Sequence, residues 1–396
     1  LNYILTNKCI FNKIRKLEPA HYIEFNFDNH FEKNEYWKLE KFYENKKKFN
    51  IDEFEELMND KIKITSEYDR KIGTFLSGGL DSGYLASQIS RFNSNQISTT
   101  YKFENKFFDE SSQASFTANF LNIENSLTSD LNYNHADDLS KIVYSLDEPM
   151  SDTSILPFYQ LCGYSKKFSK VFISGDGGDE IFLGYDTYIA DKLNINFHYL
   201  KPLLNIFKFL FKSSKEQEKK LSNYFKYKRL IENMNSNFVD SHHKWRKIFD
   251  KSDLINAISR DYYNSINNDD SYIQFNNIFQ KIKNNDFINK FSFLDIKTWL
   301  VDDILVKADR LSMAHGLEVR SPFLNHKIVE YIASLSSSEK ISYFNKKKIL
   351  KKICNKQFPK LIINREKKGF NSPVANLINS DFKILIDDYL NSNNAK

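Results

Sequence analysis

The sequence is poor in cysteine and has no long apolar segment, and each shortage excludes a class of protein. Its three cysteines, Cys9, Cys162 and Cys354, share no metal-ligand spacing and suit no disulfide framework. This favours reduced thiols in the cytoplasm. No apolar run reaches the roughly 20 residues of a membrane span, and we find no signal-peptide pattern. We therefore expect a cytoplasmic protein without a membrane partner.

A strong excess of one charge is also missing. Lys and Arg number 57 against 51 Asp and Glu, and the net charge is +6. Because the lysines are scattered among acids rather than gathered into a stripe, we expect no nucleic-acid partner. Two short lysine runs, at residues 46–48 and 346–348, are interpreted as solvated surface.

Residue patterns divide the chain at a connector rich in Lys and Asn, and we place the parts at 1–45 and 46–396. The first part reads as short strands, including 10–11 and 21–25. In the second part strands and helices alternate, which predicts a parallel α/β sheet followed by a largely helical C-terminal half. We expect strands at 71–76, 97–103 and 170–173, and helices at 51–70, 83–92, 110–120, 137–145 and 156–168.

A glycine-rich loop follows the first of these strands. It reads Ser77-Gly78-Gly79-Leu80-Asp81-Ser82 and leads into a helix. Glycines let the backbone approach an anion closely, and the helix start offers unpaired N–H groups. The serine hydroxyls add donors, and Asp81 can hold a magnesium ion beside phosphates. The loop has neither the Gly-Lys-Ser/Thr ending of a Walker loop nor dinucleotide-fingerprint spacing. An ordinary glycine-rich turn is the alternative.

A second loop of the same kind follows the strand at 170–173. It reads Ser174-Gly175-Asp176-Gly177-Gly178-Asp179-Glu180. Its position at a strand end predicts that it lies beside the first loop. Asp179 can then supply a second carboxylate to magnesium, opposite Asp81, and Asp176 can face a substrate. A flexible acidic loop is the alternative.

The two loops together resemble those of the asparagine synthetase family. Further blocks agree and occur in family order: Phe108-Asp109-Glu110, Leu146–Pro149 with Asp152 and Ser154, Asp309–Leu324, and Arg365–Phe370 with Pro373. Residues 14–22 resemble the end of the family's glutaminase domain, and Tyr36-Trp37 its connector. None of the three cysteines can be that domain's catalytic residue, so we expect the glutaminase chemistry to lie outside this piece.

The resemblance implies a pyrophosphate-loop ATPase fold of the adenine nucleotide α-hydrolase type, with ATP and Mg²⁺ as cofactors. It implies adenylation of a carboxylate, aspartate in the family's name enzyme, and then attack by glutamine-derived ammonia. Lys367 and Asp176 take catalytic roles, and Asp81 and Asp179 hold the metal. A homodimer is the candidate assembly. The resemblance implies that adenine lies against the backbone near Phe75, Leu76 and residues 100–103. The implied nucleotide-binding residues are Phe75, Leu76, Ser77, Gly78, Gly79, Asp81, Ser82, Tyr101, Ser174 and Gly175.

Some positions depart from the family pattern and keep other functions open. Asp176 stands where some members have Glu, Asn325 stands where Asp is frequent, and an arginine is missing after Asp152. These changes weaken the case for aspartate. The rivals are a related amide ligase for a sugar acid, peptide or β-amino acid, a non-enzymatic binding module, and a tRNA-modifying enzyme.

Two pairs of charged residues in and after the family's helical block have more than one interpretation. Lys307 and Arg310 lie about one helical turn apart. They can line the cleft, or they can pair with Asp303 or Glu318. Glu318 and Arg320 can simply bridge each other.

Overall fold

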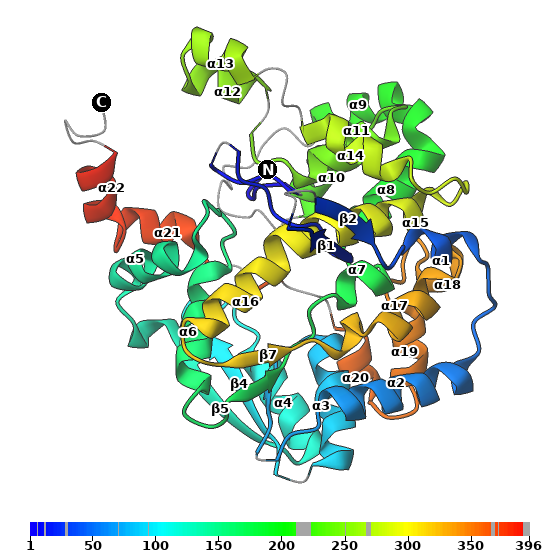
Figure 1. Ribbon diagram of the computed structural model, residues 1–396, viewed down its shortest axis with the longest axis vertical. Coiled ribbons are helices and arrows are strands. Elements are labelled where there is room, and N and C mark those ends of the chain that lie inside the picture. The colour runs from blue at the N-terminus through cyan, green and yellow to red at the C-terminus, as the bar shows by residue number, and fades with distance from the viewer. Residues whose placement is uncertain are drawn as a thin grey trace.

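The centre of the molecule is a parallel five-stranded sheet in the order β5-β4-β3-β6-β7 (Figure 1). The computed structural model describes residues 1–5, 7–11, 13–27, 31–69, 71–93, 95–210, 223–249, 251–266, 271–365, 369–370 and 372–390. The parallel sheet with helices on both faces confirms the predicted α/β class. The strands are β3 Gly73–Phe75, β4 Ile97–Lys102, β5 Glu124–Ser129, β6 Val171–Ile173 and β7 Glu318–Arg320.

Two of these strands were not predicted from the sequence. β5 is an edge strand with one buried residue among six, so it lacks the apolar run that marks a central strand. β7 has three residues and follows a helix in a largely helical half. Both pair in register with a predicted strand, β5 with β4 and β7 with β6.

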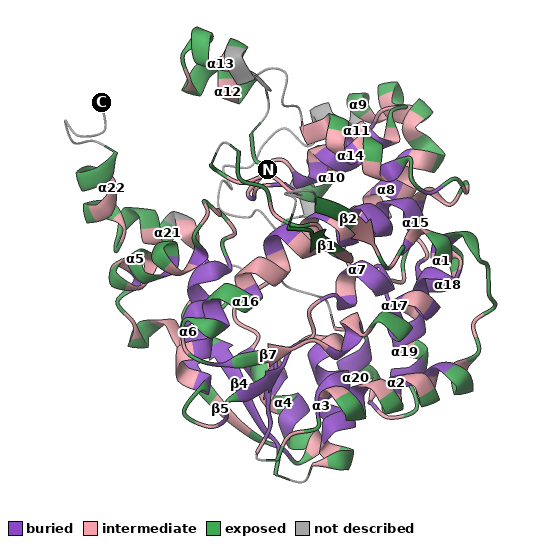
Figure 2. Ribbon diagram, in the orientation of Figure 1, coloured by how far each residue is buried: buried purple, intermediate pink, exposed green. Residues whose placement is uncertain are grey.

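Each face of the sheet is covered by helices, and successive strand residues turn to opposite faces. Phe75 packs with α5 His135–Leu146, α6 Ile155–Ser165 and α16 Leu305–Met313, whereas its neighbour Leu76 packs with α3 Leu80–Phe92 and α4 Ser111–Leu121. Figure 2 shows the buried residues gathered where these helices meet the sheet.

The rest of the second part is helical, as predicted. A large apolar core joins β6 and α3 to helices from both ends of the chain. Among the described residues, no helix combines the length and apolar character needed to cross a membrane. The remaining helices are α1 Glu40–Glu44, α2 Ile51–Thr65, η1 Asp130–Asn132, α7 Gly178–Phe182, α8 Asp186–Phe197, η2 His198–Leu200, α9 Lys201–Leu210, α10 Asn223–Asn233, α11 Phe238–Arg246, α12 Lys251–Ala257, α13 Arg260–Ile266, α14 Ser271–Phe279, α15 Phe287–Asp295, the π-helix η3 Ile296–Ile304, η4 Pro322–Leu324, α17 His326–Ala333, α18 Ser337–Lys340, α19 Lys348–Cys354, α20 Lys360–Ile363, α21 Val374–Asn379 and α22 Lys383–Tyr389.

An antiparallel ribbon near the start of the chain forms a two-stranded sheet of its own, drawn in dark blue in Figure 1. The predicted strand at 21–25 is confirmed as β1 His21–Phe25, and it pairs with β2 Phe31–Glu35. The apolar side chains Phe25 and Phe31 face each other on this ribbon and are exposed. The strand expected at 10–11 does not form.

A buried charge cluster fixes the helices behind the second loop. The imidazole of His242 hydrogen-bonds Asp191 at 2.7 Å and Asp295 at 3.1 Å, and Arg246 also pairs with Asp295. Burial alone would lower the pKa of His242, but the two carboxylates outweigh it and raise this pKa from 6.5 to about 9. The protonated imidazole therefore stabilises the folded protein.

This raised pKa predicts a loss of stability at alkaline pH. The contribution of His242 is fully present below pH 6.5 and is lost as the pH rises through about 9, on the order of 3 kcal/mol in the free energy of unfolding. Urea unfolding from pH 6 to 10 measures this fall. His242→Gln should show a much smaller fall, whereas His21→Gln, at a half-buried position on the β1–β2 ribbon, should follow the parent. Equal falls in all three proteins would contradict the assignment.

Candidate active site

The first loop is shaped by its own serines. The hydroxyl of Ser82 lies 3.0 Å from that of Ser77 and 3.2 Å from the Ser77 amide nitrogen, and the Gly79 N–H donates to Ser77 Oγ at 3.1 Å. These bonds hold the glycines at the end of β3, directly before α3. Ser77 and Ser82 therefore shape the loop. The predicted role of their hydroxyls as phosphate donors stays a prediction.

The second loop requires glycine at its centre. Gly177 has φ of +83°, in the left-handed region, and a Cβ there would lie 2.1 Å from Leu324 Cδ2. The chain then turns into α7 at Gly178. Because β3 and β6 are parallel neighbours, both loops leave the same edge of the sheet.

The two loops meet at Asp81. A Cβ on Gly175 would lie 3.2 Å from Asp81 Cβ, and one on Gly178 would lie 3.1 Å from Asp81 Cγ. One ammonium group, that of Lys347, pairs with both Asp81 and Asp179, at 2.7 Å in the case of Asp179 Oδ1. The structure therefore brings the two predicted metal carboxylates to a single cation.

Lys347 corrects a prediction from the sequence. We interpreted residues 346–348 as solvated surface, but Lys347 is 7% exposed. It has φ of +54° and stands directly before α19. Its neighbours Lys346 and Lys348 do bond at exposed positions, to Asp186 and to the Ser338 carbonyl. The local pattern of three lysines gives no sign of which one is buried.

The late family motif also reaches the first loop. The guanidinium of Arg365 donates to the carbonyls of Gly78 at 3.3 Å and Gln113 at 2.8 Å, and to Thr117 Oγ1 at 2.9 Å. Arg365 thereby anchors the start of this motif to the loop. Lys367, the predicted catalytic lysine, lies outside the described residues, so its role stays a prediction.

Asp176 is positioned by its own loop, because Ser174 Oγ donates to Asp176 Oδ2 at 2.7 Å. Nearby, the ammonium of Lys307 binds Asp152 at 2.7 Å and Ser154 Oγ at 2.6 Å. Lys307 is thus paired with Asp152, and not with Asp303 or Glu318, the two acids considered from the sequence.

The other charged residues of the helical block pair near its ends. Arg310 donates to Asp147 at 2.7 Å at an exposed position, and not to Asp303 or Glu318. The predicted bridge between Glu318 and Arg320 is confirmed at 2.7 Å.

The residues predicted to bind adenine lie next to the first loop but are occupied by other bonds. The Leu76 N–H donates to the Thr99 carbonyl, and the Leu76 carbonyl accepts from Thr100 Oγ1 at 2.7 Å. Tyr101 is buried, and its hydroxyl donates to Gln160 at 2.5 Å. Phe75 is buried against the helices behind the sheet. The adenine contacts of Phe75, Leu76 and Tyr101 stay predictions.

The loops have the donor set for a magnesium ion that arrives with a nucleotide. Asp81 Oδ1 is buried and has no hydrogen-bond partner among the described residues. No cluster of three or more His, Cys, Asp and Glu that can bind a metal occurs in the described part of the chain. Magnesium in nucleotide sites uses one or two carboxylates together with phosphate oxygens and water. Asp81 and Asp179 fit this pattern.

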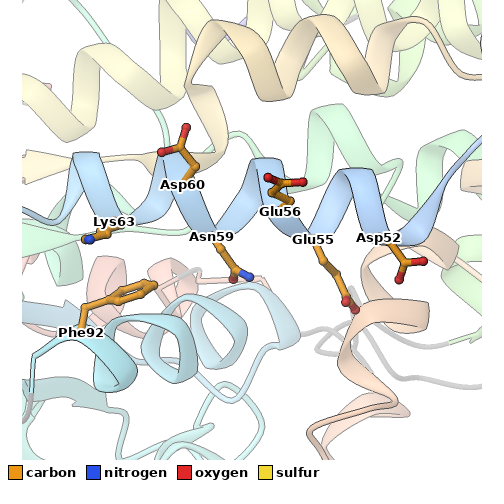
Figure 3. Close-up of a pocket in the computed structure, with 7 residues that line it drawn as sticks. All are labelled: Asp52, Glu55, Glu56, Asn59, Asp60, Lys63 and Phe92. Carbon is orange, nitrogen blue, oxygen red and sulfur yellow. The ribbon is translucent and has the colours of Figure 1, made fainter.

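A separate hollow of about 490 Å³ lies along α2 (Figure 3). It is open and mostly acidic, and neither loop contributes to its lining. We therefore assign it no part in the chemistry. Its lining consists of Asp52, Glu55, Glu56, Asn59, Asp60, Lys63 and Phe92.

Comparison with known proteins identifies the family of this chain. The model of the asparagine synthase family matches residues 53–396. Asparagine synthetase [glutamine-hydrolyzing] 1 of Bacillus subtilis (strain 168) is 29% identical over 332 residues, which cover 84% of this chain and 51% of that protein. The amidase chyE of Penicillium rubens is 23% identical over 409 residues, 93% of this chain and 60% of that one. This chain spans about half the length of the curated asparagine synthetases it matches.

One solved structure aligns with this chain only loosely. The NH3-dependent NAD synthetase from Campylobacter jejuni aligns with a TM-score of 0.26 at 17% identity, over 56% of this chain and 93% of that chain.

Proposed function

Because this chain belongs to the asparagine synthase family, we propose that it uses ATP to activate a carboxylate, which ammonia then converts into an amide. The observation that carries the proposal is the convergence of Asp81 and Asp179 on one buried cation between two glycine-rich loops. Such a site suits a polyphosphate, because backbone N–H groups, a helix start and a cation all favour negative charge there.

The reaction has two steps. An oxygen of the substrate carboxylate attacks the α-phosphorus of ATP, the bond to the β-phosphate oxygen breaks, and pyrophosphate leaves with the bonding electrons. Ammonia then attacks the carbonyl carbon of the acyl-adenylate, its nitrogen loses a proton, and the bond to the AMP oxygen breaks. A carboxylate oxygen alone is a poor leaving group. After adenylation it departs as part of AMP, which is a good leaving group.

The residues divide these tasks. The first loop, anchored by Arg365, holds the departing pyrophosphate, and Lys347 supplies fixed positive charge beside it. Asp81 and Asp179 would hold a magnesium ion, which would supply positive charge against the phosphates. Lys367 is the proposed cation for the charge that develops on the α-phosphate, since a flexible ammonium suits a shifting charge. Asp176 faces the substrate.

Aspartate is the first candidate substrate, and the product is then asparagine. A related ligase for another carboxylate is the second candidate. It is supported by the departures at Asp176 and Asn325, and by the similarity to a protein named an amidase. Both candidates share the same nucleotide chemistry.

We further propose that residues 1–45 form the end of a glutaminase domain and its connector, with 46–396 as the synthetase domain. The exposed apolar ribbon of β1 and β2 supports this, because such surface is usually covered by another part of the protein. Glutamine is then the source of ammonia. A cytoplasmic location, a homodimer and the absence of a nucleic-acid partner belong to the same proposal.

A pyrophosphate-release assay tests the function. The protein is given MgATP, ammonium chloride and one carboxylate from a panel containing aspartate, sugar acids, β-amino acids and peptides. We expect release that depends on aspartate. Release with another acid alone would select the second candidate, and no release with any acid would contradict the proposal.

A further inference from the structure

The acid that pairs with Lys347 from the second loop stands on a very short helix. α7 has five residues, and Asp179 is the second of them. Isolated helices shorter than about 12 residues are marginal in water, and the last carbonyls of any helix lack partners within it. The place of Asp179 therefore depends on what holds α7 from outside.

The space around Asp179 leaves little room for a shift of this helix. A Cβ on Gly184 would overlap both Asp179 Oδ1 and Lys347 Cε. The chain also turns back at this point, because the Gly184 N–H donates to the Asp179 carbonyl at 2.8 Å. A displacement of α7 would therefore move the carboxylate away from the place where it meets Lys347.

One side of α7 is held by α15, which lies against it (Figure 1). Ser292 of α15 is 0% exposed, and its hydroxyl donates to the Glu180 carbonyl at 2.8 Å. Glu180 is the residue directly after Asp179. Because a buried carbonyl without a partner is unfavourable, this bond fixes the position of α7 against α15.

A tyrosine from the first part of the chain supports this serine. Tyr43 Oη lies 3.0 Å from Ser292 Oγ, and both side chains are buried. A serine hydroxyl has one proton, and Ser292 gives it to Glu180, so Tyr43 is the donor of the second bond. Burial raises the pKa of Tyr43, which keeps its hydroxyl protonated. The bonds therefore run in one direction, from Tyr43 through Ser292 to the backbone of Glu180.

Tyr43 itself is firmly held, although it belongs to the connector. It lies in α1, and its carbonyl accepts from Asn284 Nδ2 at 2.7 Å. Its ring meets that of Phe293 edge-on, with 5.8 Å between the centroids. Earlier in the connector, the Trp37 indole N–H donates to Glu330 at 2.9 Å. The connector is thus built into the large apolar core.

We propose that Tyr43 and Ser292 are positioning residues, which hold α7 at the place where Asp179 can ligate magnesium together with Asp81. Both act through the backbone of Glu180. The connector then does more than join two parts of the chain, because its tyrosine sets the metal affinity of the site. This inference rests on the proposed function, in which Asp179 is a magnesium ligand.

Binding of a magnesium–nucleotide complex tests the inference. Tyr43→Phe removes one hydroxyl and keeps the ring, whereas Ser292→Ala removes both bonds. The probe is the preformed complex of Mg²⁺ with α,β-methylene-ATP, followed by isothermal titration calorimetry. We expect its Kd to rise about 3-fold in Tyr43→Phe and about 10-fold in Ser292→Ala, the effect of losing one or two hydrogen bonds.

Kinetics separate positioning from a general loss of activity. In pyrophosphate release at saturating ATP, the magnesium concentration that gives half the maximal rate should rise by the same factors. The rate at saturating magnesium and the KM for the carboxylate should stay within about two-fold of the parent, because neither bond reaches the reacting groups. A fall in the saturated rate with an unchanged magnesium requirement would overturn the inference.

Tyr331→Phe is the matched control. Tyr331 lies in the same core, and its hydroxyl bonds the N–H and the carbonyl of Asn50, both at 3.1 Å. Loss of this hydroxyl should lower the urea midpoint and leave the Kd of the magnesium complex unchanged. A rise in Kd as large as that of Tyr43→Phe would mean that any loosening of the core weakens the site, and would contradict a specific role for Tyr43.

The double variant tests the order of the bonds. Ser292→Ala already breaks the link to Glu180, so adding Tyr43→Phe should leave the rise in Kd at about 10-fold. Independent effects would multiply to about 30-fold, and that result would refute the chain of bonds.

The two proposals fail in different ways. A parent protein that does not bind the magnesium–nucleotide complex would contradict the proposed function and the inference with it. Equal binding by the parent and Tyr43→Phe would contradict the inference alone. Tyr43→Phe differs from the parent by one oxygen atom, so the test holds even if Ser292→Ala does not fold.

Discussion

Replacing Asp81 by Asn should lower pyrophosphate release by about 10³-fold or more, because the change removes a charged ligand at the place where phosphate charge must be neutralised. The fold should persist. Asn has nearly the same shape, and Lys347, the partner of Asp81, keeps its ion pair with Asp179. Steady-state release under saturating MgATP measures the effect, and circular dichroism reports the fold.

The matched control is Asp186→Asn. Asp186 also pairs with lysines, Lys226 and Lys346, but its own side chain is half exposed and it belongs to neither loop. We expect its activity to stay within a factor of two of the parent. Turnover of Asp81→Asn at the parent's rate would refute the proposed role of Asp81.

Replacing Lys347 by Met should both destabilise the protein and impair catalysis. The change leaves Asp81 and Asp179 facing each other without their shared cation. Removing one partner of a buried ion pair costs about 3–5 kcal/mol. Urea unfolding measures this loss. We also expect pyrophosphate release to fall about 100-fold, because fixed charge beside the leaving group is lost.

Magnesium distinguishes this explanation from a simple packing defect. In Lys347→Met the two carboxylates can share a magnesium ion, so 10 mM MgCl₂ should raise the variant's urea midpoint more than the parent's. Lys348→Met, at the neighbouring lysine that contacts neither carboxylate, should change neither stability nor the magnesium response. A Lys347→Met protein as stable as the parent and indifferent to magnesium would contradict the ion-pair account.

The site loops could be predicted from the sequence because their signal is local. A short apolar strand, glycines and an acid follow one another at 71–82 and again at 170–180, and both stretches form the predicted strand and turn. Parallel neighbours place such turns at one sheet edge, so the approach of Asp81 to Asp179 also followed. Family membership agrees with the order of the motifs.

The parts that were missed depend on contacts between distant segments. β5 forms a strand because it pairs with β4, although its own residues are mostly polar. Lys347 is buried because α19 packs beside α7, which holds Asp179; nothing in the lysine run indicates this. Lys307 pairs with Asp152, which is 155 positions away in sequence, and not with the acids on its own helix or nearby. Sequence spacing identifies candidates for such pairs but does not rank them.

The most direct test of the central claim is the structure of this protein with magnesium and a non-hydrolysable ATP analogue. We predict that the β- and γ-phosphates lie between the turns at 77–82 and 174–180, with Asp81 and Asp179 both ligating magnesium. Density for the triphosphate elsewhere, or a metal held by neither carboxylate, would contradict the account.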